Sequence, residues 1–151
     1  MNKLIFATHN SNKVKEVREL LSDSFEILGL NDIGFNEDII EDKLTIMENS
    51  IKKAEFVKIK TGYDCFADDT GLEVDALNGQ PGVFSKRFAG PNSSSDDNIN
   101  KLLEMLGNNT NRAARFKTVI SLSKNGQIIT FEGICEGNIA HERMGNLGFG
   151  Y

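Results

Sequence analysis

The chain has 151 residues, of which 39% are hydrophobic and 26% are charged, as expected for one soluble globular domain with a substantial core. Its net charge of −5 argues against broad electrostatic binding of nucleic acid. The apolar run "LIFA" near the N-terminus is too short for a signal-peptide core, and no later segment is long and apolar enough to span a membrane. We therefore expect a cytoplasmic protein with neither nucleic acid nor a membrane as a partner.

The two cysteines support the same expectation. Cys65 and Cys135 each lie within an apolar, strand-like run, and their spacing matches no zinc or redox motif. We interpret both as buried free thiols, which favours a reducing compartment.

The first part of the chain alternates strand and helix patterns. These are a buried strand over residues 3–8, a helix over 11–23, a second strand over 25–30, an acidic loop over 31–43 and a helix over 45–62. The first helix has core spacing at Val14, Val17 and Leu21. In the second helix, Thr45 and Glu48 form a capping-box pattern, and a glycine at position 62 fits the C-terminal stop. Its predicted buried stripe is Met47, Ile51, Ala54 and Val57.

The remaining elements also mix strands and helices. They are short strands over residues 63–69 and 72–77 split by Gly71, turns over 78–85, a helix over 94–107, a hairpin over 113–137 and a glycine-rich irregular segment over 138–151. The helix has Ser94 or Ser95 as its N-cap. Its predicted inward positions are Ile99, Leu102, Leu103 and Leu106. The order of elements predicts an α/β fold with a mixed sheet and flanking helices.

Two adjacent acids, Asp68 and Asp69, directly follow the apolar run of the strand at residues 63–69. Neighbouring strand residues point to opposite faces, and an inward-pointing carboxylate is costly to bury alone. Either the strand ends there and both acids reach water, or a cation holds them. Carboxylates at a strand end suit Mg²⁺, which takes one or two carboxylates and keeps several waters. A turn rich in Asp, Thr and Gly explains the same residues equally well.

The segment "THNSNK", residues 8–13, follows a strand and opens a helix. Free backbone N–H groups at a helix N-terminus bind anions, and Lys13 adds a point charge suited to phosphate. A simple helix cap by Asn10 or Ser11 is the alternative interpretation. The segment lacks the glycines of a P-loop.

Other candidate residues are ambiguous when they are taken singly. Asn49 and Lys53 share one helix face, which by itself indicates a solvated charged surface, and Glu41 is an ordinary loop acid. Phe149, between two glycines, is suited either to stacking on a flat base or to anchoring a loop by packing.

Taken together and in this order, these segments resemble the non-canonical purine nucleoside triphosphate pyrophosphatases, also called inosine triphosphate pyrophosphatases. The most specific match is "FADDTGLEVDALNGQPGVFSKRFAG", supported by "THNSNK", "ENSIKKA" and "GFGY". The resemblance extends from Leu4 to Tyr151. It implies a long twisted mixed sheet, with two lobes around a nucleotide cleft, and usually a homodimer. It also implies Mg²⁺-dependent cleavage of inosine, deoxyinosine and xanthosine triphosphates between the α and β phosphates, which gives the monophosphate and pyrophosphate.

The resemblance also implies roles for individual residues. Glu41 and Asp69 hold Mg²⁺, Asp69 accepts the proton and Asp68 supports the same network of metal and water. The substrate-binding residues are Thr8, His9, Asn10, Ser11, Asn12, Lys13, Lys53, Thr70, Phe149, Gly150 and Tyr151, of which the last three belong to the base-binding loop. The family pattern continues after "GFGY" with an Asp-Pro pair, a lysine and a Ser-His-Arg segment. We therefore expect residues 1–151 to be a single pyrophosphatase domain without that C-terminal segment.

Two alternatives to this function stay open. One is a pyrophosphatase of the Maf-like type that acts on modified pyrimidine nucleotides, although the long "ADDTGLEVDAL" run argues against it. The other is an inactive fragment that binds nucleotide without turnover.

Overall fold

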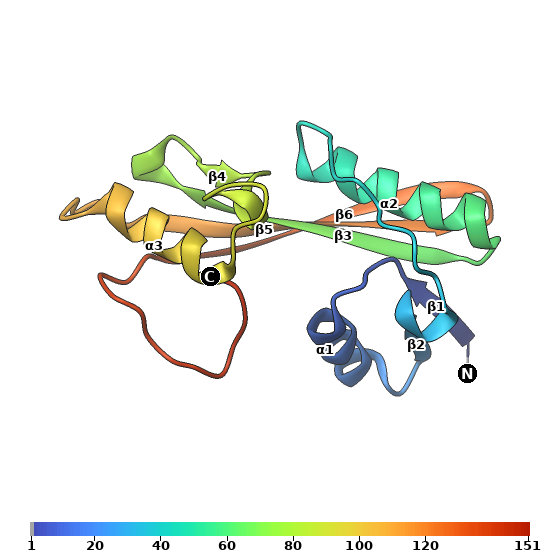
Figure 1. The fold of residues 1–151 in the computed structure, drawn as a ribbon. Helices are drawn as coiled ribbons and strands as arrows, with labels where there is room; N and C mark the ends of the chain where they lie inside the picture. The colour runs from blue at the N-terminus through green and yellow to red at the C-terminus, as the bar shows by residue number, and fades with distance from the viewer. Residues whose placement is uncertain (1) are drawn as a thin grey trace. The chain divides into compact units, whose positions relative to one another are not determined.

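The computed structural model describes residues 2–151, in which six strands form one mixed sheet (Figure 1). The strands are β1 (Asn2–Phe6), β2 (Phe25–Gly29), β3 (Cys65–Val74), β4 (Pro81–Gly82), β5 (Ala113–Lys124) and β6 (Gln127–Asn138). The helices are α1 (Ser11–Leu21), α2 (Ile46–Thr61) and α3 (Ser95–Leu106), with 3-10 turns η1 (Asn31–Ile33), η2 (Asp75–Leu77) and η3 (Ser85–Arg87). None of the helices within these residues is long and apolar enough to cross a membrane.

The strand order is β2-β1-β3-β5-β6, with β4 beside β3. Strand β1 pairs in parallel with β2 and β3, whereas β4 pairs antiparallel with β3. The predicted turn between β5 and β6 is present, with positive φ angles of 52° at Asn125 and 77° at Gly126. The predicted mixed sheet with flanking helices is therefore confirmed.

The chain divides into two compact units. The first contains the chain up to Asp69 together with Val119–Glu132, and the second contains Thr70–Thr118 and Gly133–Tyr151. Strands β3, β5 and β6 each contribute residues to both units. Two lobes were expected and two units are observed, whereas the nucleotide cleft stays a prediction.

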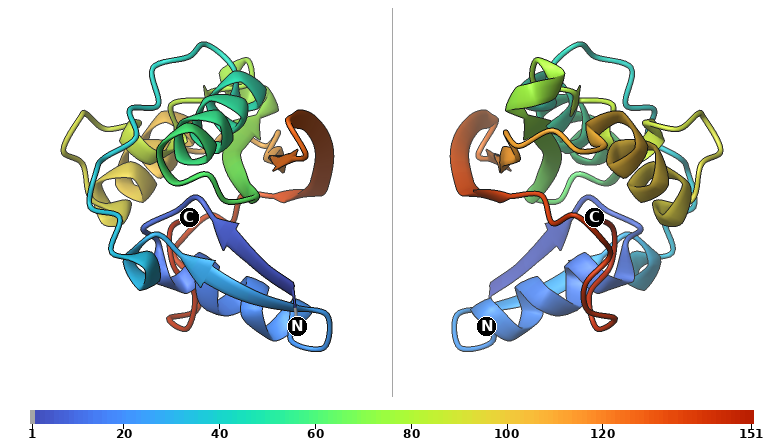
Figure 2. Two further views of the ribbon diagram at one scale, coloured as in Figure 1. Left: turned by 90° about the vertical axis from the view of Figure 1, so that its right-hand side faces the viewer. Right: turned by 90° about the vertical axis from the view of Figure 1, so that its left-hand side faces the viewer.

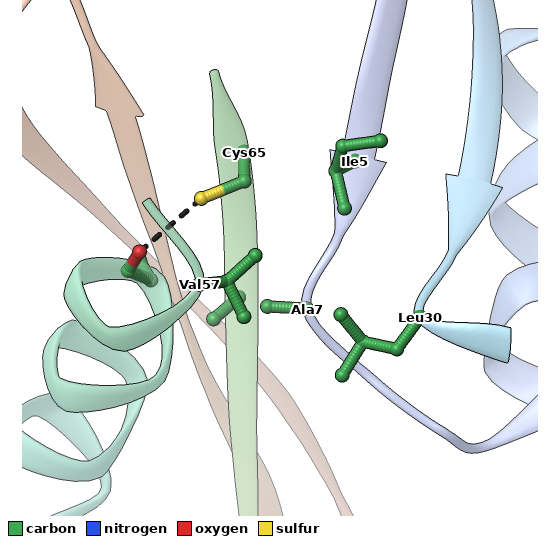
Figure 3. Close-up of a cluster of buried hydrophobic side chains, with 7 residues drawn as sticks. Ile5, Ala7, Leu30, Val57 and Cys65 are labelled. Atoms are coloured by element: carbon green, nitrogen blue, oxygen red, sulfur yellow. Dashed lines mark hydrogen bonds between the residues drawn. The ribbon is translucent and has the colours of Figure 1, made fainter. Parts of the chain in front are cut away.

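Both faces of β1 and β3 are buried in the first unit, because α1 and α2 lie on opposite sides of these strands (Figures 1 and 2). On the α2 side, the buried cluster consists of Ile5, Ala7, Leu30, Ala54, Val57, Cys65 and Ala67 (Figure 3). The alternate residues face α1 and form a second cluster of Phe6, Val14, Ile27 and Phe66. The thiol of Cys65 donates to the carbonyl of Ala54 at 3.2 Å, and burial raises its pKa to about 11.

Strand β3 does not end at the two aspartates and is not split by Gly71, so both of these predictions were wrong. The strand runs without a break from Cys65 to Val74. Gly71 lies inside it because β4 approaches closely: a Cβ at this position would lie 2.7 Å from the carbonyl oxygen of Gly82. Here the glycine permits a close backbone contact rather than breaking the strand.

Helix α2 begins and ends where the sequence predicts. The Thr45 side chain accepts from the backbone N–H of Glu48, and Gly62 adopts a left-handed conformation at the C-cap. The predicted buried stripe was rotated, because Met47 is 42% exposed. The residues that the helix buries are Ile46, Asn49, Ser50, Lys53, Ala54 and Val57. The predicted Ala54 and Val57 are thus confirmed, whereas Met47 is exposed, because half of the buried stripe is polar and apolar spacing alone does not reveal it.

In the second unit, α3 packs on the far part of β3. Ser94 and Asp97 form a complete capping box, which confirms Ser94 as the N-cap. Of the four predicted inward positions, Leu102 and Leu106 are fully buried and form a cluster with Leu72, Val74 and Ala114.

Two predictions of burial were wrong. Cys135 is exposed, because it lies on β6, which is solvent-accessible along nearly its whole length at the edge of the sheet. Leu21 is also exposed, because it is the last residue of α1, whose only buried residue is Val14.

Candidate functional site

Asp68 and Asp69 occupy consecutive positions of β3 and are 7% and 8% exposed, so neither reaches open water as one interpretation of the sequence required. Because successive strand residues point to opposite faces, the two carboxylates have different surroundings. Asp68 meets Lys13 of α1, whose Nζ lies 2.6 Å from Oδ2. Asp69 instead lies near residues of α2 and of the loop that precedes it.

The turn before α1 combines a helix cap with a charged side chain. Asn10 is the N-cap, and its Oδ1 accepts from the backbone N–H groups of Asn12 at 3.0 Å and Lys13 at 3.3 Å. The Thr8 hydroxyl accepts from the Asn10 N–H at 3.1 Å. Ser11 and Asn12 are exposed on the first turn of the helix. The cap interpretation is thus right for Asn10, and the same turn directs Lys13 to the strand acids.

The His9 side chain contacts the segment that follows β2. Its Nδ1 lies 2.9 Å from Oδ1 of Asn31, and its Nε2 lies 3.0 Å from the carbonyl oxygen of Glu37. The hydrogen bond with Asn31 is the main cause of a raised pKa for His9, and the Glu37 carbonyl and the charge of Asp38 add to it. The ring therefore holds the loop that leads to Glu41.

Asp69 is the most perturbed acid of this region. Burial is the main cause that raises its pKa to about 6, and repulsion by the nearby Glu41 carboxylate is the second. The positive charge of Lys53, the Asn49 amide and Lys13 act in the opposite direction. Lys53 is itself 7% exposed and lies 3.3 Å from Oε1 of Glu41. Two acids and one buried cation thus gather at the same place.

The interpretation of Asn49 and Lys53 as a solvated face was wrong, because both are buried. Asn49 is the residue of this region that sequence reasoning left out of the site. The sequence does contain a signal for the burial of Asn49. Positions 46, 49, 50, 53, 54 and 57 have the spacing of one helix face, and three of them are polar.

No group of three or more His, Cys, Asp or Glu side chains among residues 2–151 is arranged to hold a metal ion. The Glu41–Asp69 pair still fits Mg²⁺, which commonly uses one or two carboxylates and completes its shell with water and substrate phosphate. The mutual repulsion that raises the pKa of Asp69 is the interaction that a divalent cation would relieve.

The other predicted site residues belong to the second unit. The Thr70 hydroxyl lies 2.8 Å from that of Thr118. Phe149 is 46% exposed, and the Tyr151 hydroxyl donates to the carbonyl of Ser85 at 2.7 Å. With Gly150 and α3, Phe149 and Tyr151 line a cavity of about 790 Å³.

Residues 4–151 match the model of the Ham1 family. A protein of Flavobacterium johnsoniae named dITP/XTP pyrophosphatase is 54% identical over 149 residues, which cover 99% of this chain and 78% of that protein. A protein of Porphyromonas gingivalis with the same name is 50% identical over 152 residues, with 100% and 78% covered.

Solved structures give the same result. The Ham1 protein of Staphylococcus aureus superposes with a TM-score of 0.85 at 38% identity, and 99% of this chain and 78% of that one are covered. A HAM1 protein from Coxiella burnetii superposes with a TM-score of 0.88 at 39% identity, with 100% and 79% covered.

Proposed function

Because the chain belongs to the Ham1 family, we propose that it hydrolyses non-canonical purine nucleoside triphosphates, namely the triphosphates of inosine, deoxyinosine and xanthosine. The products are the nucleoside monophosphate and pyrophosphate, and the role is to remove aberrant purines from the nucleotide pool. The names of the relatives, dITP/XTP pyrophosphatase, support this substrate class. Residues 1–151 would act as one pyrophosphatase domain.

The observation that carries the proposal is the buried Asp69 carboxylate beside Glu41 and Lys53. Hydrolysis of a phosphoanhydride needs charge neutralisation, positioning and an activated water rather than covalent help. In our proposal Glu41 and Asp69 would hold Mg²⁺, which when bound would supply positive charge to the phosphates and acidify a water.

Asp69 is suited to accept the proton of the attacking water. Without a bound metal, burial and the Glu41 carboxylate raise the pKa of Asp69 to about 6, so its carboxylate is mostly ionised at neutral pH. The water oxygen forms a bond with the α-phosphorus, the bond from this phosphorus to the bridging oxygen breaks, and pyrophosphate leaves. Asp68, which pairs with Lys13, would support the same network of metal and water from the neighbouring strand position.

The α1 turn would bind the triphosphate. The Lys13 ammonium and the positive end of the helix dipole offer positive potential at this N-terminus, where phosphate binds well. We assign the segment from Thr8 to Lys13 to triphosphate binding. Within it, the His9 side chain is hydrogen-bonded to Asn31. Lys53 adds positive charge nearby, Thr70 contacts the substrate, and the loop from Phe149 to Tyr151 binds the base.

A substrate panel tests the function. Pyrophosphate release is measured with inosine, deoxyinosine and xanthosine triphosphates, with ATP and dGTP, and with modified uridine triphosphates, each with Mg²⁺ and with EDTA. We expect Mg²⁺-dependent release from the first three. Preference for the modified uridine nucleotides would favour the Maf-like alternative, and binding without release would favour the inactive one.

We further propose a homodimer in the cytoplasm. A reducing compartment suits the exposed free thiol of Cys135. Light scattering coupled to size exclusion gives the mass in solution, and a monomer at micromolar concentration would contradict the dimer.

A further inference from the structure

The acidic loop before α2 is fastened to that helix at three consecutive residues. The Lys53 ammonium lies 3.3 Å from Glu41, and that of Lys52 lies 2.7 Å from Asp42. The backbone N–H of Lys43 donates to Oδ1 of Asn49 at 2.9 Å. The position of Glu41 is therefore set by contacts with the helix.

Asn49 differs from the two lysines because it is almost fully buried, at 1% exposure. Its Oδ1 accepts the N–H of Lys43 in the loop. Its amide group hydrogen-bonds toward the Asp69 carboxylate on strand β3. One side chain thus connects the loop that carries Glu41 with the strand that carries Asp69.

We propose that Asn49 is a positioning residue of the metal site, which fixes the distance between the Glu41 and Asp69 carboxylates by holding the backbone of the loop at Lys43. This inference rests on the proposed function, because it assumes that the two acids share a divalent ion. A buried amide suits this role because it is neutral, short and held on a helix, so it restrains the loop without adding charge between two acids. Side chains that orient metal ligands in this way typically contribute 10-fold to 100-fold to metal affinity or activity.

The inference is tested by a Mg²⁺ titration of Asn49→Ala. We expect the Mg²⁺ concentration at half-maximal rate to rise about 10-fold or more. Saturating Mg²⁺ should restore most of kcat, because every residue assigned to the substrate is intact. KM for inosine triphosphate at saturating Mg²⁺ should change less than threefold, on the order of what loss of a remote contact causes. An unchanged Mg²⁺ requirement, or a loss of kcat that Mg²⁺ does not restore, would overturn the proposal.

Ser50→Ala is the matched control. Ser50 is equally buried on the same helix, but its hydroxyl bonds Ser121 and the carbonyl of Met47 instead of the acidic loop. Its loss should lower the melting temperature without changing the Mg²⁺ requirement. If Asn49→Ala does not fold, Asn49→Leu keeps the number and branching of the side-chain heavy atoms and removes the same hydrogen bond.

A second readout separates this inference from the proposed function. The rise in melting temperature with Mg²⁺ is measured without nucleotide, and its midpoint should shift to about 10-fold higher Mg²⁺ in Asn49→Ala. A wild-type chain that binds Mg²⁺ but releases no pyrophosphate would refute the proposed function. The Asn49 proposal would then be decided by the Mg²⁺ midpoint of Asn49→Ala, and an unshifted midpoint would overturn it. A wild-type chain that Mg²⁺ does not stabilise would overturn the Asn49 proposal.

Discussion

The ammonium of Lys13 lies 2.6 Å from Oδ2 of Asp68, which joins the first turn of α1 to the middle of β3. This pair brings the turn that opens α1 next to the strand acids. Together with the proposed binding of triphosphate, it gives Lys13 two separable roles, one in stability and one in binding.

Lys13→Ala should therefore lower stability and weaken binding of inosine triphosphate more than binding of inosine monophosphate. The stability loss arises because the buried Asp68 carboxylate no longer has the Lys13 charge beside it. Adding Asp68→Asn should restore the melting temperature but not triphosphate affinity. Lys15→Ala, on the exposed side of the same helix, is the control. Equal loss of affinity for both nucleotides would contradict the polyphosphate role.

Asp69→Asn should abolish turnover and, without metal, stabilise the fold at pH 8. Burial and Glu41 raise the pKa of Asp69 to about 6, so ionised Asp69 destabilises the native state. The gain should be on the order of 2 kcal/mol in the free energy of unfolding in EDTA. Asp64→Asn provides a control of opposite sign, because a hydrogen bond from Lys58 lowers the pKa of Asp64. A wild-type rate in Asp69→Asn would remove this residue from the mechanism.

Stabilisation by Mg²⁺ should depend on pH. The raised pKa of Asp69 means that its favourable contribution to folding is complete below its unfolded pKa near 3.8 and is lost as the pH rises through about 6. Mg²⁺ must bind the ionised form, so the rise in melting temperature at 5 mM should be larger at pH 8 than at pH 5. About 5 mM is on the order of a saturating concentration for a weak Mg²⁺ site. A rise that does not depend on pH would argue against carboxylate ligands.

His9 should be protonated over a wider pH range than a free histidine. The acceptors Asn31 and Glu37 raise its pKa above 6.5, so its contribution to stability is present below 6.5 and is lost as the pH rises through the folded value. NMR titration of the His9 ring measures that value directly. In His9→Gln, the loss of stability between pH 6.5 and the folded pKa of His9 should disappear. A titration midpoint below 6.5 would refute this prediction.

Gly71→Ala should destabilise the second unit by about 1–3 kcal/mol, because its Cβ would lie 2.7 Å from a backbone oxygen of Gly82 that has little freedom to move. Gly133→Ala is the matched control, because a Cβ there meets nothing within 4 Å. Chemical denaturation measures both. Similar midpoints for the two variants would show that β4 tolerates displacement.

Local signals predicted the ends of elements well. Thr45 and Gly62 were correctly identified as caps, and Ser94 was one of two candidates, because capping depends on a few neighbouring residues. Alternation and helical spacing also located the main strands and helices, and with them the mixed sheet.

Signals that depend on distant contacts were misleading. Gly71 was interpreted as a break because the sequence does not show that β4 lies against it. The polar side of α2 was placed in solvent because its burial depends on the acidic loop and on Asp69, which are distant in sequence. The resemblance indicated Glu41, Lys53 and Asp69 together, whereas Asn49 emerged only from the structure.

The polar interior side of α2 has a consequence for attempts to make this protein more robust. Selection for thermal tolerance alone would favour an aliphatic replacement at the buried position 49, because hydrocarbon in place of a buried polar group often strengthens a fold. Such a variant would withstand heat better but would lose a group that holds the acidic loop. Directed evolution of a hardier form should therefore leave this helix unchanged and seek its gains on the surface of α3.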